Sequence, residues 1–241
     1  MTETLNRKTS ELERLLVRVA LEHAPAAVAS SLSAEDMVIT DVILRHELGI
    51  EIFTLDTQRL HADTLNVIAA IRARYGYEVR VFHPNPESVS EYVANFGRDA
   101  FYESQELRKR CCHIRKVEPL NRALEGKEAW ITGQRREQAV TRAELRVQEN
   151  DAARGIVKFN PLADWSEDDV WGYVHAFDVP YNALHDQGYR SIGCAPCTRP
   201  TVAGEHVRAG RWWWEIREAR ECGLHVAADG RLVRSAATSE V

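Results

Sequence analysis

The fold of this chain is decided by one stretch, Ala26-Ala27-Val28-Ala29-Ser30-Ser31-Leu32-Ser33-Ala34-Glu35-Asp36-Met37. Residues 26–29 form a short apolar run, which is typical of a buried strand, and the pattern from 37 to 48 predicts a helix. Ser33 and Asp36 have the spacing of a capping box at the start of that helix. Hydroxyl and backbone N–H groups therefore lie where a strand passes into a helix, which suits the binding of an anion.

Strands and helices alternate outward from this stretch. An amphipathic pattern over 11–23 predicts an opening helix that ends before Pro25. Further helices are predicted at 62–75, near 104–125 and at 166–176, and further strands at 50–55, 78–82 and 129–132. Such alternation favours parallel pairing through right-handed crossovers. We therefore expect an α/β fold with a doubly wound, mostly parallel sheet. We also expect a single domain over 1–241, with a core at about 26–200 and a C-terminal tail at about 201–241.

Polar segments follow the predicted strands at 30–33, 56–57 and 133–136. In open α/β sheets, ligands bind at the carboxyl ends of the strands, next to a topological switch point. We expect these three segments to converge there. The chain has no G-x-x-x-x-G-K-[ST] and no G-x-G-x-x-G after its first strand, which argues against P-loop and dinucleotide-binding proteins.

Composition and charge restrict the kind of partner. Of the 241 residues, 44% are hydrophobic, and 31 Lys and Arg against 36 Asp and Glu give a formal net charge of -5. These values are typical of a soluble globular protein, and the negative balance gives no overall positive field for nucleic acid. No apolar run approaches the ~20 residues of a transmembrane helix, and the first residues lack the apolar stretch of a signal peptide. We expect a cytoplasmic protein that binds neither nucleic acid nor membranes.

The five cysteines are too few for a disulfide scaffold in a chain of this length. Four of them form two close pairs, Cys111-Cys112 and Cys194-x-x-Cys197. The second pair is typical of a metal knuckle or of a thiol redox pair. Adjacent residues of a helix point about 100° apart, so Cys111 and Cys112 reach two irons of a wide cluster more easily than one small ion. The pattern favours a 4Fe-4S cluster, and structural zinc stays open as the alternative.

Cys222 stands apart from both pairs, in the segment Glu221-Cys222-Gly223-Leu224-His225. One interpretation is a spare core cysteine. The other is a reactive thiolate assisted by His225, with Gly223 allowing the backbone to approach a ligand closely.

Basic residues gather beside the cysteines and at the end of a predicted strand. They are Arg108, Lys109, Arg110, Arg115, Lys116, Arg135, Arg136, Arg208 and Arg211. In a chain of net negative charge this predicts a small anionic substrate, because arginine forks suit sulfate or phosphate oxygens. The neighbours Trp212, Trp213 and Trp214 cannot all enter one core, so we expect at least one to line a cleft or a subunit contact.

Several motifs resemble those of one family. The most specific are Cys111-Cys112-His113-Ile114-Arg115-Lys116-Val117-Glu118-Pro119-Leu120 and Gly193-Cys194-Ala195-Pro196-Cys197-Thr198-Arg199. Supporting pieces are Leu55-Asp56-Thr57, Ile131-Thr132-Gly133-Gln134-Arg135, Asn160-Pro161-Leu162, Gly210-Arg211-Trp212-Trp213-Trp214-Glu215 and Glu221-Cys222-Gly223-Leu224-His225. With these pieces in order, from about residue 26 to 226, the chain resembles the assimilatory adenylyl-sulfate (APS) reductases of the APS/PAPS reductase family.

The resemblance implies an adenine nucleotide α-hydrolase-like fold with a mobile C-terminal tail. It implies a 4Fe-4S cluster held by Cys111, Cys112, Cys194 and Cys197. In this family the cysteine that matches Cys222 attacks the sulfur of APS, AMP leaves, and the enzyme carries an S-sulfocysteine. Thioredoxin then releases sulfite, and the family forms homo-oligomers.

The resemblance also assigns side chains around the substrate. A lysine like Lys116 links the cluster to the substrate. Arg135, Arg208 and Arg211 would bind the sulfate and phosphate oxygens, and His225 would lie beside them. Ser31, Ser33 and Leu55 would lie around the nucleotide.

The chain departs from the family pattern in two loops. Residues 30–36 are poorer in glycine than the usual S-F-S-G-A-E-D, and Gln58 stands where glycine is common.

Family members with both cysteine pairs mostly use APS and a minority also accept PAPS, so a dual APS/PAPS reductase is one alternative. An ATP pyrophosphatase of related fold would need S-G-G-x-D-S after the first strand, which this chain lacks. A non-enzymatic iron–sulfur redox sensor would explain the cysteines but not the ordered arginines or the tryptophans.

Overall fold

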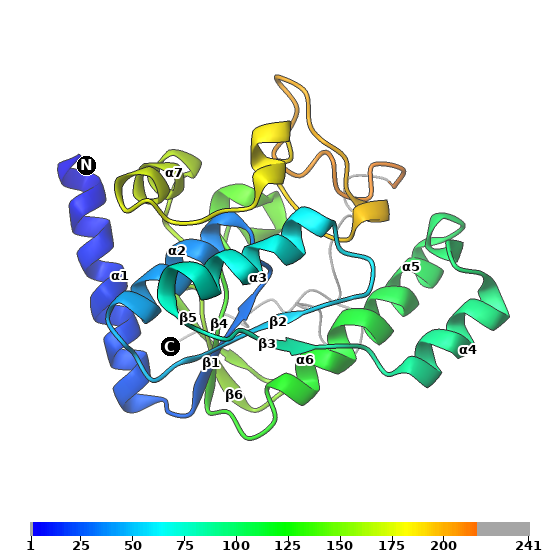
Figure 1. Ribbon diagram of the computed structural model, residues 1–241, viewed down its shortest axis with the longest axis horizontal. Helices are drawn as coiled ribbons and strands as arrows, with labels where there is room; N and C mark the ends of the chain where they lie inside the picture. Colours follow the sequence, from blue (N-terminus) through cyan, green and yellow to red (C-terminus); the bar gives the residue numbers. More distant parts are fainter. Residues whose placement is uncertain (1, 216–241) are drawn as a thin grey trace, which may run out of the picture.

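A computed structural model describes residues 2–215 of the protein, so Cys222 and His225 lie outside the described residues. Its centre is a six-stranded sheet with the order β3-β2-β1-β4-β6-β5 (Figure 1). The strands are β1 (Ala26–Ser30), β2 (Glu51–Leu55), β3 (Arg80–Phe82), β4 (Ala129–Ile131), β5 (Gln148–Asp151) and β6 (Ile156–Phe159). Neighbouring strands pair in parallel, except that β5 and β6 are antiparallel. The predicted doubly wound, mostly parallel α/β sheet is confirmed.

Helices alternate with the strands along the chain. The α-helices are α1 (Glu3–Glu22), α2 (Ala34–Arg45), α3 (Ala62–Tyr75), α4 (Pro86–Phe96), α5 (Gln105–Cys112), α6 (Glu118–Ala123) and α7 (Glu167–Ala176). The opening helix is longer than predicted, because the Thr2 side chain accepts a hydrogen bond from the Leu5 N–H and caps it at Glu3. Within residues 2–215, no helix has both the length and the apolar character needed to cross a membrane.

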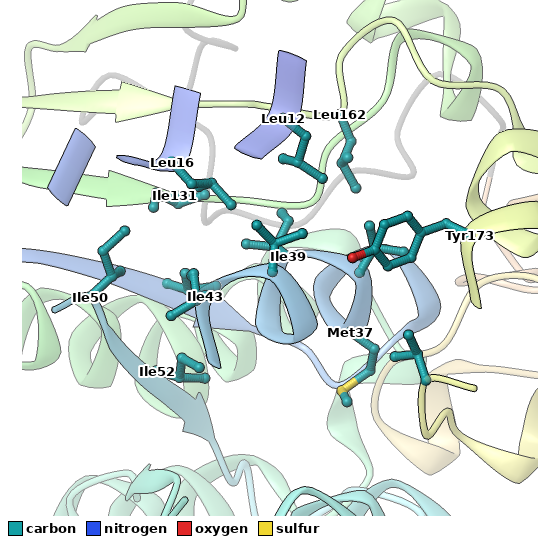
Figure 2. Packing of buried hydrophobic residues seen from close by; sticks show 14 of the residues in the cluster. Leu12, Leu16, Met37, Ile39, Ile43, Ile50, Ile52, Ile131, Leu162 and Tyr173 are labelled. Carbon is teal, nitrogen blue, oxygen red and sulfur yellow. The ribbon is translucent and has the colours of Figure 1, made fainter. Parts of the chain in front are cut away.

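Two hydrophobic clusters occupy the opposite faces of the sheet. Successive strand residues point to opposite faces. The larger cluster takes Val28, Ile52 and Ile131, and the smaller takes their neighbours Ala27, Phe53 and Trp130. Residues of α1, α2 and α7 cover the larger cluster, and those of α6 cover the smaller. Figure 2 shows Leu12 and Leu16 of α1 facing Ile39 and Ile43 of α2, with Ile52 beyond them. The sheet is thereby covered on both faces.

The β5–β6 hairpin is absent from the sequence-based prediction. Strand β5 reads Gln148-Glu149-Asn150-Asp151, without an apolar residue, because it forms the edge of the sheet and pairs with β6 alone. Strand β6 pairs in parallel with β4 and extends the sheet past the switch point.

Helix α4 was not predicted either. The predicted strand at 78–82 ends directly before His83-Pro84-Asn85-Pro86, a sequence without a predicted helix. In the structure the Asn85 side chain accepts hydrogen bonds from the N–H groups of Glu87 and Ser88, and Pro86 occupies the first turn. The same residues therefore end β3 and begin a helix, and α4 and α5 extend away from the sheet (Figure 1).

A buried carboxylate connects three helices, α2, α3 and α7, through hydrogen bonds. Asp41 of α2 is 1% exposed. It accepts hydrogen bonds from the Tyr75 hydroxyl of α3 at 2.9 Å and from the Tyr173 hydroxyl of α7 at 2.6 Å. Arg45 balances its charge, with Nε at 3.1 Å, and donates through Nη2 to the Tyr173 oxygen at 2.8 Å. Because each partner is satisfied, this network stabilises the packing of α2, α3 and α7.

Tyr173→Phe is therefore expected to destabilise the fold. The substitution keeps the ring but removes a hydroxyl that bonds two charged groups, which costs about 1–2 kcal/mol in the free energy of unfolding. Urea denaturation at fixed metal content measures this change. Tyr181→Phe is the matched control, because the hydroxyl of Tyr181 bonds Asp186 at an exposed position, and it should change stability by less than about 0.5 kcal/mol. An unfolding midpoint unchanged by Tyr173→Phe would contradict this role.

Candidate functional site

A cavity lies at the carboxyl ends of the strands, where β1 pairs with β2 on one side and β4 on the other. Such a switch point leaves a crevice that the connecting helices do not fill. The cavity is lined by residues that follow three strands, among them Ser31 after β1, Thr57 after β2, and Gly133 and Gln134 after β4. The predicted convergence of these segments is confirmed.

Asp36 organises the loop after β1. Its Oδ2 accepts hydrogen bonds from the Ser31 backbone N–H at 2.7 Å and from the Ser31 hydroxyl at 2.5 Å. The predicted capping box is wrong, because the Ser33 side chain makes no capping hydrogen bond and Asp36 turns to Ser31 instead. A Cβ on Gly133 would collide with Asp36 Oδ1, so the close approach of the two loops requires glycine there. Burial raises the pKa of the Asp36 carboxyl from 3.8 to about 6.

The predicted substrate residues fall into two groups. Ser31, Ser33, Leu55, Lys116, Arg208 and Arg211 all line the cavity. Arg135 is not among the lining residues and is 2% exposed. Its Nε donates to Glu35 at 2.9 Å and its Nη1 to the Trp165 carbonyl at 3.3 Å. Arg135 therefore holds the first turn of α2 through Glu35, and it is not among the residues that line the cavity with the other predicted ligands.

Arg211 is held in place by its surroundings. Its Nη1 donates to the Ile192 carbonyl at 3.0 Å and lies 3.4 Å from the Ser191 hydroxyl. A Cβ on Gly193 would overlap the Arg211 guanidinium. The glycine before the C-x-x-C pair thus makes room for a buried cation.

Three of the paired cysteines share one apolar pocket, here called the thiol cluster. Cys194 and Cys197 are buried with Phe101 and Trp212, and Cys111 packs against them. Cys112 is buried at the neighbouring position of α5. Burial raises the pKa of the Tyr92 hydroxyl to about 12, and Cys111 and Cys112 act in the same direction. In the part of the chain that the structure describes, no three side chains of the metal-ligating types converge as ligands of a single metal ion.

Cations from the cavity side face the thiol cluster. Burial, followed by the charge of Cys194, raises the pKa of the Cys197 thiol to about 12, while Lys116 and Arg211 act in the opposite direction. Burial also raises the pKa of Cys111, and Arg115 and Lys116 lower it.

A π-helical turn, η2 (His113–Val117), places two of these cations. The Glu118 N–H donates to the His113 carbonyl, five residues back. Pro119 next to it has no N–H and would clash with the carbonyl four residues earlier in a regular helix, which favours the wider turn. Arg115 donates through Nη1 to the Thr57 carbonyl at 2.7 Å, and Lys116 faces the cavity. The turn therefore joins the first cysteine pair to the strand-end loops.

Two arginines of the cavity wall were not predicted from the sequence. Arg142 and Arg190 both line the cavity. Arg142 donates to Gln138, and Arg190 forms an ion pair with Glu167. Neither arginine lies in a recognisable motif, so only the folded chain reveals them. Trp212 lines the cavity, which confirms the expectation that at least one of the three tryptophans lines a cleft, and Trp213 is 37% exposed.

The Asp36 pKa predicts how stability varies with pH. Since the folded-state pKa lies above the unfolded one, the contribution to stability is complete below about pH 3.8 and is lost as pH rises through about 6. The difference corresponds to about 3 kcal/mol. Asp36→Asn should therefore gain stability relative to wild type between pH 4 and pH 7, as measured by urea unfolding across this range. Asp168→Asn, at an exposed position, should follow the wild type; identical pH dependence of all three proteins would contradict the assignment.

Known proteins match most of the chain. Residues 25–200 match the family model described as phosphoadenosine phosphosulfate reductase domain. A Burkholderia cepacia protein named adenosine 5'-phosphosulfate reductase is 59% identical over 94% of this chain and 90% of its own length. An Allochromatium vinosum protein of the same name is 53% identical over 93% of this chain and 88% of its own length.

Solved structures share the fold. A crystal structure of phosphoadenylyl-sulfate (PAPS) reductase from Candida auris, a phosphate complex, has a TM-score of 0.68 and 25% identity, covering 83% of this chain and 98% of its own. FMN adenylyltransferase of Candida glabrata in complex with ATP has a TM-score of 0.58 at 13% identity, covering 90% of this chain and 74% of its own. The second likeness concerns the fold alone. The expected adenine nucleotide α-hydrolase-like fold is confirmed.

Proposed function

Because the chain belongs to the phosphoadenosine phosphosulfate reductase family, we propose that it reduces adenylyl sulfate (APS) to sulfite and AMP in sulfate assimilation. The observation that carries this function is the position of the thiol cluster, which shares Trp212 with the wall of the cavity. A substrate in the cavity thus lies beside the paired cysteines. The relatives named adenosine 5'-phosphosulfate reductase support the choice of APS.

The cavity suits an adenine nucleotide that carries a sulfate. Its place at the switch point is where open α/β sheets bind nucleotides. Lys116, Arg208 and Arg211 all line the cavity and supply positive charge to its wall. Guanidinium forks bind sulfate and phosphate oxygens in pairs. Ser31, Ser33 and Leu55 would contact the nucleotide. Arg135 would support this site indirectly, through its ion pair with Glu35 at the start of α2.

Cys222 would be the nucleophile. Its thiolate attacks the sulfur of APS and forms an S–S bond, while the bond from that sulfur to the phosphate oxygen of AMP breaks. AMP leaves with the electron pair, and the enzyme carries an S-sulfocysteine. His225, three residues further on, would sit beside the reacting groups.

A dithiol protein of the thioredoxin type would complete the reaction. One of its thiolates attacks the Cys222 sulfur and releases sulfite, and its second thiol then closes a disulfide and frees Cys222. The dithiol thereby supplies both electrons of the reduction. This scheme agrees with a cytoplasmic enzyme, where thiols are kept reduced, and we extend the proposal to a homo-oligomer.

The residues around the thiol cluster fit an iron–sulfur group. Four cysteine sulfurs are the usual ligands of a 4Fe-4S cluster, and Cys111, Cys112, Cys194 and Cys197 would hold it. Among the described residues, Arg211 Nε and Trp212 Nε1 are buried donors without a hydrogen-bond partner. An anionic, sulfur-bearing group beside them would supply the missing acceptors. When bound, the cluster would order the site and contribute electrostatically rather than pass electrons.

The sulfur transfer can be observed directly. Anaerobically purified, iron-replete protein is incubated with APS or PAPS that carries radioactive sulfur, without thioredoxin. Label and a sulfonate mass are expected on Cys222 from APS, and Cys222→Ser should acquire neither. Label from both nucleotides would identify a dual APS/PAPS reductase. Absence of label from either would contradict the function and favour an iron–sulfur redox sensor.

Loss of one cysteine ligand should remove the cluster. Cys197→Ser is expected to give colourless protein with little iron and a lower free energy of unfolding, because cluster ligation contributes folding free energy. Iron analysis and visible absorbance measure this, with Cys222→Ser as the matched control that keeps its iron. A brown, iron-replete Cys197→Ser protein would rule out the ligand assignment.

A further inference from the structure

Trp212 belongs both to the wall of the cavity and to the thiol cluster, which the sequence motifs did not predict. Its ring is 1% exposed, lines the cavity and packs in the thiol cluster. Three guanidinium groups lie over this one ring. Their Cζ atoms are 4.7 Å (Arg108), 4.7 Å (Arg211) and 6.0 Å (Arg208) from its centroid.

Three like charges around one side chain repel each other, so their gathering needs a cause. Arg108 is 0% exposed and has its charge balanced by Glu215, with Nε–Oε1 2.5 Å and Nη2–Oε2 2.9 Å. Arg208 and Arg211 carry the remaining positive charge to the cavity wall. The feature common to all three is the electron-rich face of the indole, which attracts cations within about 6 Å.

The backbone at Trp212 supports a specific role for this side chain. Its φ is +43°, in the left-handed region that bulky residues avoid. Such a conformation persists only where the surroundings over-determine it, and it is common at functional sites. The Trp212 N–H donates to the Cys197 carbonyl at 3.2 Å, and its carbonyl accepts from the Glu215 N–H at 2.9 Å. These bonds fix the indole between the C-x-x-C loop and the Arg108–Glu215 ion pair.

We propose that Trp212 is a positioning residue for the reaction, whose indole faces hold Arg208 and Arg211 toward the anionic oxygens of the nucleotide. This inference rests on the proposed function. Arg108 and Glu215 complete the assembly by anchoring the ring from the side of α5. An aliphatic side chain could fill the same space but would leave the two guanidinium groups without their π partner.

Trp212→Phe and Trp212→Met form the matched test pair, because their side chains are similar in size and only one is aromatic. Calorimetry measures the dissociation constant for AMP in the full-length, iron-replete protein, and for APS with Cys222→Ser added to prevent transfer. Trp212→Met should weaken binding by about tenfold, and Trp212→Phe should restore most of the loss. Trp213→Met, one residue along and 37% exposed in the wild type, should bind as tightly as wild type.

A double-mutant cycle separates positioning from general packing. If Trp212 acts through Arg211, Trp212→Met should cost only about threefold in an Arg211→Met background, since one of its partners is already gone. An equal loss in both backgrounds, or equal binding by the Phe and Met variants, would overturn the inference while the function stands. A wild-type protein that binds neither AMP nor APS would overturn the function itself.

Discussion

The parallel pairing of β1 with β2 on one side and with β4 on the other is the constraint on which the site depends. It makes the loops after these strands meet at one edge, where the connecting helices leave a crevice. The loops after β1 and β4 lie close together. Asp36 accepts two hydrogen bonds from Ser31, and it occupies the space that a side chain at residue 133 would need. The polar floor of the cavity therefore follows from strand order together with one buried carboxylate.

The same positively charged side chains lie close to both the cavity and the thiol cluster. Lys116 and Arg211 line the cavity, yet they also oppose the raised pKa of the Cys197 thiol. In a chain of net charge -5 these cations are concentrated where two anionic groups would come together. Under the proposed function, filling one site would change the electrostatic balance of the other, and this would connect the paired cysteines to substrate binding. The π-helical turn before Pro119 is the local distortion that allows Lys116 to serve both.

Periodicity predicted the parts of the fold whose patterns are strong, and failed where tertiary context decides. The helix at 62–75 and the central strands were predicted because their apolar residues face a core. The edge strand β5 has no apolar residue, so only its pairing with β6 defines it. At the site, the strand-end loops and the two cysteine pairs were located from spacing and motif. The sequence did not reveal that Arg135 bonds Glu35 at the start of α2, nor that Arg142 and Arg190 line the cavity. These contacts join segments that lie far apart in the chain.

The central claim is that the cavity at the switch point binds the nucleotide beside the paired cysteines. A crystal structure of the iron-loaded protein with AMP tests it most directly. We expect AMP between the carboxyl ends of β1 and β4, with its phosphate within hydrogen-bond distance of Arg208 or Arg211. AMP bound elsewhere, or in the cavity with its phosphate contacting neither arginine, would contradict it.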